Sequence, residues 1–457
     1  MAGPAIDPVD FFALGRRISH ERLLWGIPAR GTYVVGVGEA LALTGSGPRR
    51  FADVAAAWRR LVEASLSESV AEDGAGGPLL VGGFAFDPLR PATPLWDGFP
   101  EGRMTVPRLQ LHSEDGRRLL TLNVLVDEGT DAAQELSAFQ DELQVLGLYD
   151  ANGRRDGSAA AGNGVQPSET DGSAAEGGLT LTDVNPEAWK QAVETVSALI
   201  KERRLEKVVL ARRVQARAPH AISVSRALAS LRSRYPDCFL FAVARDGRCF
   251  LGASPEQLIQ VRNREVNIMG LAGTAPRHPD PDEDRRLGEG LLASPKEREE
   301  HAVVVRFIRD SVAPFCETMD VPDAPVLRRL HNVQHLFTPI RGRLEDGYTV
   351  LDVVQRLHPT PAVGGQPRDE ALAVIRDLEE LDRGWYAAPV GWVNGAGDGE
   401  FAVAIRSALV YGDEASLFSG CGIMGDSKPE AEFEESRVKL RPMIDALTAG
   451  VAGGAGG

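Results

Sequence analysis

Two segments of the sequence each place a pair of glutamates at the head of an otherwise apolar helical stripe, which restricts how the chain can fold. In the first segment, Glu297 and Glu300 are three residues apart, so at about 100° per residue they share one face of a helix. Glu299 lies off that face. The face continues through apolar side chains at helical spacing, namely Val304, Val305, Ile308 and Val312. We expect this helix to be buried on the side that carries the glutamates.

The second segment repeats this arrangement near the end of the chain. Glu432 and Glu435 share one helical face with Lys439. That face then continues through Leu440, Met443, Ile444 and Leu447. A second helix should therefore also present paired carboxylates from its first turn.

Other glutamates of this second segment have local explanations. Ser427 and Glu430 have the spacing of a capping box, so we expect Ser427 to cap the helix and Glu430 to bond back to the cap. Glu434 points away from the apolar face, towards water. Only Glu432 and Glu435 then need a partner inside the protein.

Ionised carboxylates at the head of a buried stripe are costly unless their charge is compensated. If both helices face one cavity, four like charges repel and their pKa values rise unless a cation lies between them. Mg²⁺ prefers such all-oxygen sites, takes one or two carboxylates directly and keeps several waters. The pattern therefore predicts a magnesium site that joins the two helices. The alternative is that the glutamates only compensate helix dipoles.

A lysine also lies in an unusually apolar strand. Lys207 shares one face with Leu205, Val209 and Ala211, while Val208 fills the other face, so the strand is apolar on both sides. Its amine either reaches solvent from an edge or is a desolvated group suited to act as a general base. Glu256 follows a Ser-Pro turn, where a glutamate is usually solvated.

The chain has 457 residues, enough for one large or two medium domains. We divide it into an N-terminal α+β part, a flexible Gly/Ala/Ser-rich loop or linker, a part in which strands and helices alternate, and a flexible tail. Their bounds are 1–150, 151–180, 184–447 and 448–457.

Three patterns carry the prediction for the N-terminal part. Residues 31–45 alternate like paired strands, residues 51–65 have helical spacing, and residues 106–126 are typical of a hairpin.

Composition excludes several classes of partner. Asp and Glu number 65 against 50 Lys and Arg, a net charge of -15, and no basic run offers a nucleic-acid or anionic-membrane footprint. The four cysteines form no C-x-x-C pair, so neither a zinc ribbon nor a disulfide framework is predicted. No signal peptide and no run of about 18 apolar residues is found, so we expect a cytoplasmic protein.

Eight ordered motifs resemble those of the chorismate-utilising enzymes, and within them the isochorismate synthases. They cover residues 184–447 densely and the N-terminal part more thinly. In order they are "EKVVLAR", "LGASPEQL", "LAGTAPR", "KEREEH", "HPTPAVGG", "DRGWYAAPVGW", "AIRSALV" and "GCGIMGDSKPEAEFEESRVK". The resemblance implies an α+β fold, a four-layer α/β/β/α sandwich with two large packed, mainly antiparallel β-sheets and a chorismate-binding site in a cleft.

The resemblance also implies a Mg²⁺-dependent reaction, in which water adds to C2 of chorismate and the C4 hydroxyl leaves. Lys207 matches the base that activates the water, and Glu256 matches the acid that protonates the leaving hydroxyl. Glu300 and Glu435 match direct magnesium ligands, with Glu297 and Glu432 reaching the ion through water.

Further matches are implied substrate contacts. Arg406 and Tyr386 match donors to the pyruvyl carboxylate, and a guanidinium fork suits that group. Glycines at 420 and 422 would let backbone N–H groups approach it. The remaining matched positions are Gly273, Thr274, His335, Ala362 and Lys439.

Within the family, water is the expected nucleophile, because members that use ammonia generally lack a lysine at the position of Lys207. Salicylate synthases share this lysine but typically have threonine at the position of Ala362. We therefore expect isochorismate as the product, with salicylate synthase as the alternative. A silent chorismate-binding subunit is the alternative from another class. The pathway is menaquinone or siderophore biosynthesis, and a monomer is expected.

Overall fold

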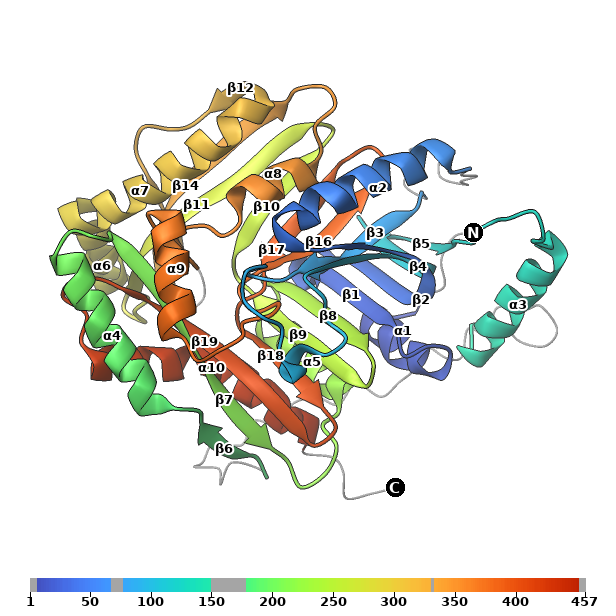
Figure 1. Cartoon of the computed structure of the whole chain (residues 1–457), viewed down its shortest axis with the longest axis horizontal. Coiled ribbons are helices and arrows are strands. Elements are labelled where there is room, and N and C mark those ends of the chain that lie inside the picture. Colours follow the sequence, from blue (N-terminus) through green and yellow to red (C-terminus); the bar gives the residue numbers. More distant parts are fainter. Residues whose placement is uncertain (1–5, 67–76, 149–177, 330–332, 452–457) are drawn as a thin grey trace.

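The computed structural model describes residues 6–66, 77–148, 178–329 and 333–451 (Figure 1). Most of the predicted linker, residues 151–177, and the end of the predicted tail, residues 452–457, lie outside the described residues.

The described strands form one hydrogen-bonded network in which every pairing is antiparallel. It bends at two long strands, β2 (Thr32–Gly45) and β4 (Gly102–Glu114), whose register shifts between Glu39 and Leu41. We call the part on the β2 side the first sheet and the part on the β4 side the second sheet.

The first sheet carries most of the motif residues. Beyond β2 its strands follow in the order β1 (Arg22–Ile27), β8 (Phe239–Arg245), β9 (Arg248–Ser254), β18 (Ser407–Tyr411), β19 (Glu414–Ile423), β7 (Lys207–Arg217) and β6 (Thr180–Asp183). The short β15 (Gly365–Gln366) pairs with the start of β7.

The second sheet continues from β4. Its strands are β5 (Arg117–Leu122), β3 (Leu79–Phe84), β16 (Pro389–Asn394), β17 (Gly399–Val403), β10 (Gln257–Arg262), β11 (Glu265–Pro276), β14 (Val333–Leu344), β12 (Cys316–Asp320) and β13 (Val326–Arg329).

The two sheets pack face to face. Trp25 of β1 contacts Trp392 of β16 with their ring centroids 6.3 Å apart. The neighbouring Leu24 belongs to a different apolar cluster, because successive side chains point to opposite faces of a strand. Both faces of the first sheet are therefore buried.

Helices cover the two outer faces, as Figure 1 shows. On the first sheet lie α1 (Pro8–Leu14), α4 (Pro186–Lys201), α5 (Val224–Arg234), α9 (Arg368–Leu378) and α10 (Pro429–Val451). On the second lie α2 (Arg50–Ala64), α6 (Pro281–Ala293), α7 (Pro295–Val312) and α8 (Val350–Leu357), while α3 (Ala132–Val145) lies at one end. The predicted four-layer sandwich is confirmed, with the addition that β2 and β4 join its two sheets.

Some of the predictions for individual helices and strands are confirmed, and others are wrong. The helix predicted at 51–65 is α2, and the hairpin predicted at 106–126 is formed by β4 and β5. The prediction of paired strands at 31–45 is wrong, because β2 is a single strand across which Gly38 has a φ of 68°. Residues 448–451 are helical rather than part of a flexible tail, because α10 ends only at Val451. The Val451 side chain is buried.

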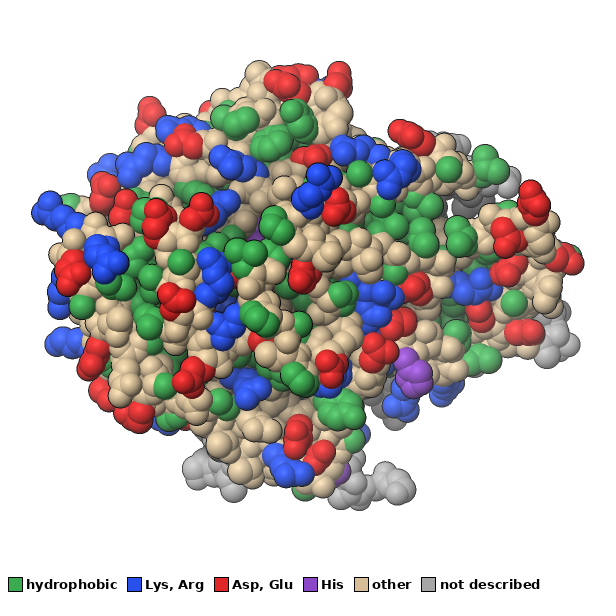
Figure 2. Space-filling view, viewed as in Figure 1, with side chains coloured by type: hydrophobic (Ala, Val, Ile, Leu, Met, Phe, Trp, Pro, Cys, Tyr) green, Lys and Arg blue, Asp and Glu red, His purple; other side chains and the backbone are tan. Residues whose placement is uncertain are grey.

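No helix among the described residues is long and apolar enough to cross a bilayer. On the face drawn in Figure 2, acidic and basic side chains are interspersed.

Candidate functional site

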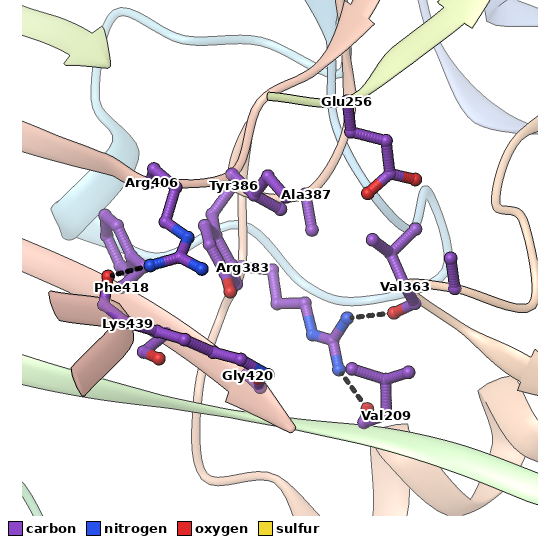
Figure 3. Close-up of a pocket in the computed structure, with 13 residues that line it drawn as sticks. Val209, Glu256, Val363, Arg383, Tyr386, Ala387, Arg406, Phe418, Gly420 and Lys439 are labelled. Carbon is purple, nitrogen blue, oxygen red and sulfur yellow. Dashed lines mark hydrogen bonds between the residues drawn. The ribbon is translucent and has the colours of Figure 1, made fainter. Parts of the chain in front are cut away.

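A cavity of about 170 Å³ opens where the C-terminal part of β19 meets α10 (Figure 3). Six residues singled out by the sequence line it, namely Glu256, Ala362, Tyr386, Arg406, Gly420 and Lys439. The other lining residues are Val209, Val363, Arg383, Ala387, Ile405, Phe418 and Ser419. The folded chain thus gathers polar groups from segments far apart in sequence.

Glu256 enters the cavity from the side opposite Lys439 (Figure 3). The turn before β10 is held by hydrogen bonds, because the Glu256 N–H donates to Ser254 Oγ at 3.2 Å and its carbonyl accepts from Val403 at 3.0 Å. Burial raises the pKa of the Glu256 carboxyl to about 7, against the opposing effects of Lys207 and Lys439. A carboxylic acid that keeps its proton near neutral pH can act as a proton donor.

Arg406 supplies a positive charge on the other side of the cavity. Its Nη1 donates to the Lys439 carbonyl at 3.0 Å, and no described carboxylate forms an ion pair with it. Burial raises the pKa of Tyr386, so its hydroxyl remains a donor at neutral pH. Burial lowers the pKa of Arg406, but a guanidinium keeps its protons in proteins, so Arg406 is a donor as well. A Cβ at position 420 would lie 3.3 Å from Tyr386 Oη, so glycine keeps this corner open.

Lys207 begins β7, on the same strand face as the lining residue Val209. Its Nζ donates to Glu300 Oε1 at 2.8 Å, so the amine is engaged with a carboxylate, and both side chains are half-buried. Gly422 lies beside it, and a Cβ there would come within 2.7 Å of Lys207 Cε. Gly422 therefore makes room for the lysine side chain, a role different from the backbone contact that the resemblance implies.

Three predicted contacts lie outside the cavity lining, on β11 and β14. Gly273 has a φ of 76° at a bulge between Ala272 and Thr274. A Cβ at position 273 would lie 3.0 Å from Glu297 Oε2. The Thr274 hydroxyl and His335 Nδ1 share a hydrogen bond of 2.9 Å, and burial lowers the pKa of His335.

The predicted metal glutamates of α10 lie together. Ligand atoms of Glu432, Glu435 and Cys421 are within 4.8 Å of one another. Burial raises the pKa of Glu432, and the nearby Glu435 charge raises it further. The Cys421 thiol donates to the Glu432 carbonyl, and burial raises its pKa to about 12, so oxygen atoms are the available ligands. This donor set fits a hard divalent cation.

The glutamates of α7 do not belong to that group. Glu300 pairs with Lys207, and Glu297 faces Gly273. The first turn of α7 nevertheless contacts the segment before α10, because Lys296 Nζ lies 3.4 Å from Asp426 Oδ2. Lys439 also pairs with Glu435 at 2.6 Å.

The predicted capping box of α10 is wrong. The helix begins at Pro429, and the Ser427 hydroxyl donates to Glu432 Oε1 at 2.6 Å while accepting from the Met424 N–H. Glu430 instead pairs with Lys190 of α4 at 3.0 Å. The chain forms a turn at Met424–Ser427 that directs the serine to the half-buried carboxylate of Glu432.

Sequence reasoning gave no role to Arg383, although the quoted motif "DRGWYAAPVGW" contains it. It is 3 % exposed and lines the cavity. The sequence does place Arg383 four residues after Glu379, a spacing that allows an ion pair between the two. The apolar wall of Val209, Ile405 and Phe418 was also missed, because a β-strand residue near a site resembles any core residue in sequence.

The gathered groups can hold an anionic substrate, donate a proton and bind a hard cation. Arg406, Tyr386 and Lys439 provide donors for carboxylates. Glu256 provides an acid, and Glu432 and Glu435 provide oxygen ligands.

Comparison with known proteins agrees with this chemistry. A family model described as "Chorismate binding enzyme" matches residues 1–448. The chain is 38% identical to "Isochorismate synthase MenF" of Bacillus subtilis over 452 residues, which covers 97% of this chain and 91% of that one. It is 40% identical over 444 residues to "Salicylate biosynthesis isochorismate synthase" of Pseudomonas aeruginosa, covering 97% and 88%.

A solved structure is also similar. The menaquinone-specific isochorismate synthase MenF of Escherichia coli superposes with a TM-score of 0.75 at 26% identity, covering 97% of this chain and 93% of that one.

Proposed function

The chain belongs to the chorismate binding enzyme family, and we propose that it is an isochorismate synthase, an isomerase that converts chorismate into isochorismate. Water adds at C2, the double bonds shift, and the hydroxyl at C4 leaves. The proposed product feeds menaquinone or siderophore biosynthesis. Support comes from the similarity to a menaquinone-specific isochorismate synthase and to a salicylate biosynthesis isochorismate synthase.

The observation that carries the proposal is the buried Glu256 in a cavity with unpaired Arg406. A carboxyl with a pKa of about 7 suits the protonation of a departing hydroxyl. Arg406 and Tyr386 suit a carboxylate of the substrate, because both present donors and Arg406 has no acidic partner among the described residues. Together they would orient the ring with its leaving hydroxyl towards Glu256.

Lys207 is the proposed base. Its Nζ accepts a proton from water only as the neutral amine, so this role requires that the Glu300 carboxylate turn away from it. Gly422 supports the role, since it leaves room for the lysine side chain. Lys207 and Glu256 would then act on opposite faces of the ring.

Glu297, Glu300, Glu432 and Glu435 are the residues that would hold Mg²⁺, with Glu300 and Glu435 as direct ligands. The chemistry that Mg²⁺ supplies when bound is neutralisation of these carboxylates and orientation of the ring carboxylate of the substrate. Ser427 fixes one oxygen of Glu432, and Lys439 holds Glu435, so both glutamates have defined positions.

The test is to incubate purified protein with chorismate and Mg²⁺ and to separate the products by chromatography. We expect isochorismate in equilibrium with chorismate. Lys207→Ala should abolish turnover while substrate binding persists, and unchanged activity in this variant would remove Lys207 as the base. A wild-type protein that binds chorismate without converting it would support the silent subunit instead.

The second candidate is salicylate synthase, in which isochorismate loses pyruvate. Ala362 lines the cavity, and alanine at this position favours release of isochorismate. Salicylate with stoichiometric pyruvate as the main product would establish the second candidate.

A further inference from the structure

A second guanidinium, that of Arg383, lines the same cavity as Arg406 (Figure 3). Each of its three nitrogens donates to the protein. Arg383 Nε donates to Glu379 Oε2 at 2.8 Å, and Nη2 donates to Glu379 Oε1. Nη1 donates to the Val363 carbonyl at 2.9 Å, and Nη2 also donates to the Val209 carbonyl at 2.7 Å. The positive charge is therefore matched by a carboxylate that is itself buried.

The two arginines differ in what they leave for a ligand. Arg406 forms one hydrogen bond to a carbonyl and has no ion pair among the described residues. Arg383 forms a bidentate pair with Glu379, and its guanidinium carbon Cζ lies 4.2 Å from the centroid of the Phe86 ring. An anionic substrate should therefore interact with Arg406 and leave the Arg383 pair intact.

The Arg383–Glu379 pair connects three walls of the cavity. Val209 follows Lys207 by two residues on β7, and Glu379 Oε1 also accepts from the Ala211 N–H of β7 at 2.6 Å. Val363 adjoins Ala362 in the segment before β15. The Arg383 carbonyl accepts from the Tyr386 N–H at 2.8 Å.

The backbone pairing between β15 and β7 is short, so the hydrogen bonds of Arg383 help to hold the two segments together. Gly365 and Gln366 pair with Val208 and Lys207, and the Val209 N–H donates to Gly364 at 2.9 Å. The ladder ends there. Arg383 extends it with two side-chain bonds, one to each segment.

We propose that Arg383 and Glu379 are a positioning pair that fixes the strand of Lys207 against the wall that carries Ala362 and Tyr386. Neither residue touches the reacting atoms. This inference rests on the proposed function, because it concerns the placement of the base for that reaction.

The experiment compares three arginine-to-lysine variants in steady-state kinetics with chorismate and Mg²⁺. Arg383→Lys keeps the charge but loses the planar fork that reaches Val209 and Val363 together. Arg406→Lys changes the proposed substrate contact. Arg376→Lys is the matched control, because Arg376 forms a comparable ion pair with Asp87 at 2.7 Å on neighbouring α9 but does not line the cavity.

We expect Arg383→Lys to lower kcat by about 10- to 100-fold while KM changes by less than about threefold, because a small displacement of Lys207 costs rate more than binding. Arg406→Lys should instead raise KM by about tenfold or more. Arg376→Lys should leave both constants near those of the wild type. Melting temperatures measured in parallel separate loss of stability from loss of positioning.

The inference is overturned if Arg383→Lys raises KM as Arg406→Lys does, since Arg383 would then bind substrate. It is equally overturned if Arg383→Lys and Arg376→Lys lower the melting temperature alike and both keep kcat. Should Arg383→Lys not fold, Glu379→Gln carries the same test, because its amide oxygen still accepts from Ala211. If the wild type itself forms no isochorismate, the proposed function fails, and this is distinct from a failure confined to the variants.

Discussion

The carboxyl of Glu256 is the group in the cavity whose protonation should govern the rate. Burial raises its pKa from the usual 4.5 to about 7, so the carboxyl is largely protonated below pH 7 and largely ionised above it. Only the protonated form can donate to the leaving hydroxyl. Because Lys207 and Lys439 oppose the shift, the raised value reflects burial in the cavity wall.

We therefore predict that kcat for isochorismate formation falls about tenfold per pH unit well above pH 7, where Glu256 has lost its proton. The measurement is a pH–rate profile at saturating chorismate and Mg²⁺. Glu256→Gln should be inactive throughout the range, whereas Glu430→Gln, an exposed change on α10, should keep the wild-type rate and profile. A profile that stays flat up to pH 9 would contradict the assignment of Glu256 as the acid.

The protonation of Glu256 should also make the stability of the folded protein depend on pH. The folded state binds the Glu256 proton more tightly than the unfolded state does. Its contribution to stability is therefore complete below about pH 4.5 and is lost as pH rises through about 7. Glu256→Gln removes this loss, so the variant should unfold at a less pH-dependent temperature between pH 5 and 8.

Single residues differ in how far sequence predicts them. Lys207 stands out because it interrupts a strand that is apolar on both sides, a pattern that strand periodicity makes visible. Glu256 does not stand out, since its burial comes from packing of segments distant in sequence. Gly422 is similar, because the space it leaves for Lys207 depends on the register between β19 and β7.

At the scale of elements, the first turn of α10 carries Glu432 and Glu435, the proposed metal ligands, on one side and the buried Phe433 on the other. Phe433 is 6 % exposed and packs against Trp189 with ring centroids 6.0 Å apart. The Arg212 guanidinium lies 4.2 Å and Lys190 Nζ 5.0 Å from the Phe433 ring centroid. These contacts attach the turn to α4 and β7, so they should fix the direction in which Glu432 points.

Phe433→Ala should therefore destabilise the protein by about 3 kcal/mol, the lower end for truncation of a buried aromatic ring. The measurement is urea unfolding followed by circular dichroism. Val438→Ala is the matched control on the same helix, because Val438 is 72% exposed, and it should change stability by less than about 0.5 kcal/mol. Equal effects of the two changes would show that Phe433 does not anchor the turn.

Helical periodicity predicted the buried face of α7 and the buried face of the later turns of α10. In the first turn of α10 the prediction is wrong, because Phe433 and Ser436 are the buried side chains. Glu432 is half-buried there, and Glu435 is exposed like Glu434.

Periodicity also could not predict how α10 begins. Ser427 has the local spacing of a cap, but a turn and a tertiary contact with Glu432 outweigh that local preference. Helix ends are decided by competition among nearby hydrogen bonds, which spacing alone does not resolve.

At the scale of the whole molecule, the sandwich itself came from the resemblance rather than from periodicity. Local patterns identified many strands, yet the partner of each strand lies far away along the chain. For example, β3 of the N-terminal part pairs with β16, and β1 pairs with β8. The N-terminal and C-terminal parts therefore share one sheet network, which no pattern within either part could reveal.

This architecture places the two glutamate helices on different sheets. The first turn of α7 reaches β7 through Glu300 and Lys207, and it reaches the segment before α10 through Lys296 and Asp426. A cation held by glutamates from both helices would therefore link the two sheets. Its binding should appear in the stability of the entire fold, since a ligand that binds only the folded state stabilises it by mass action.

We predict that Mg²⁺ raises the melting temperature of chelator-treated wild-type protein, with a stabilisation of about 2.7 kcal/mol at a Mg²⁺ concentration 100 times the dissociation constant.

The Glu432→Gln variant and the wild type should differ in stability in opposite directions with and without Mg²⁺. Without Mg²⁺ this variant should melt above the wild type, because it removes a half-buried charge that Glu435 repels, while the new amide oxygen still accepts from Ser427. With saturating Mg²⁺ it should melt below the wild type, because one oxygen ligand is weakened. Glu434→Gln, an exposed change on the same turn, should follow the wild type in both conditions. Parallel Mg²⁺ responses in all three proteins, measured by differential scanning calorimetry, would exclude Glu432 from the metal site.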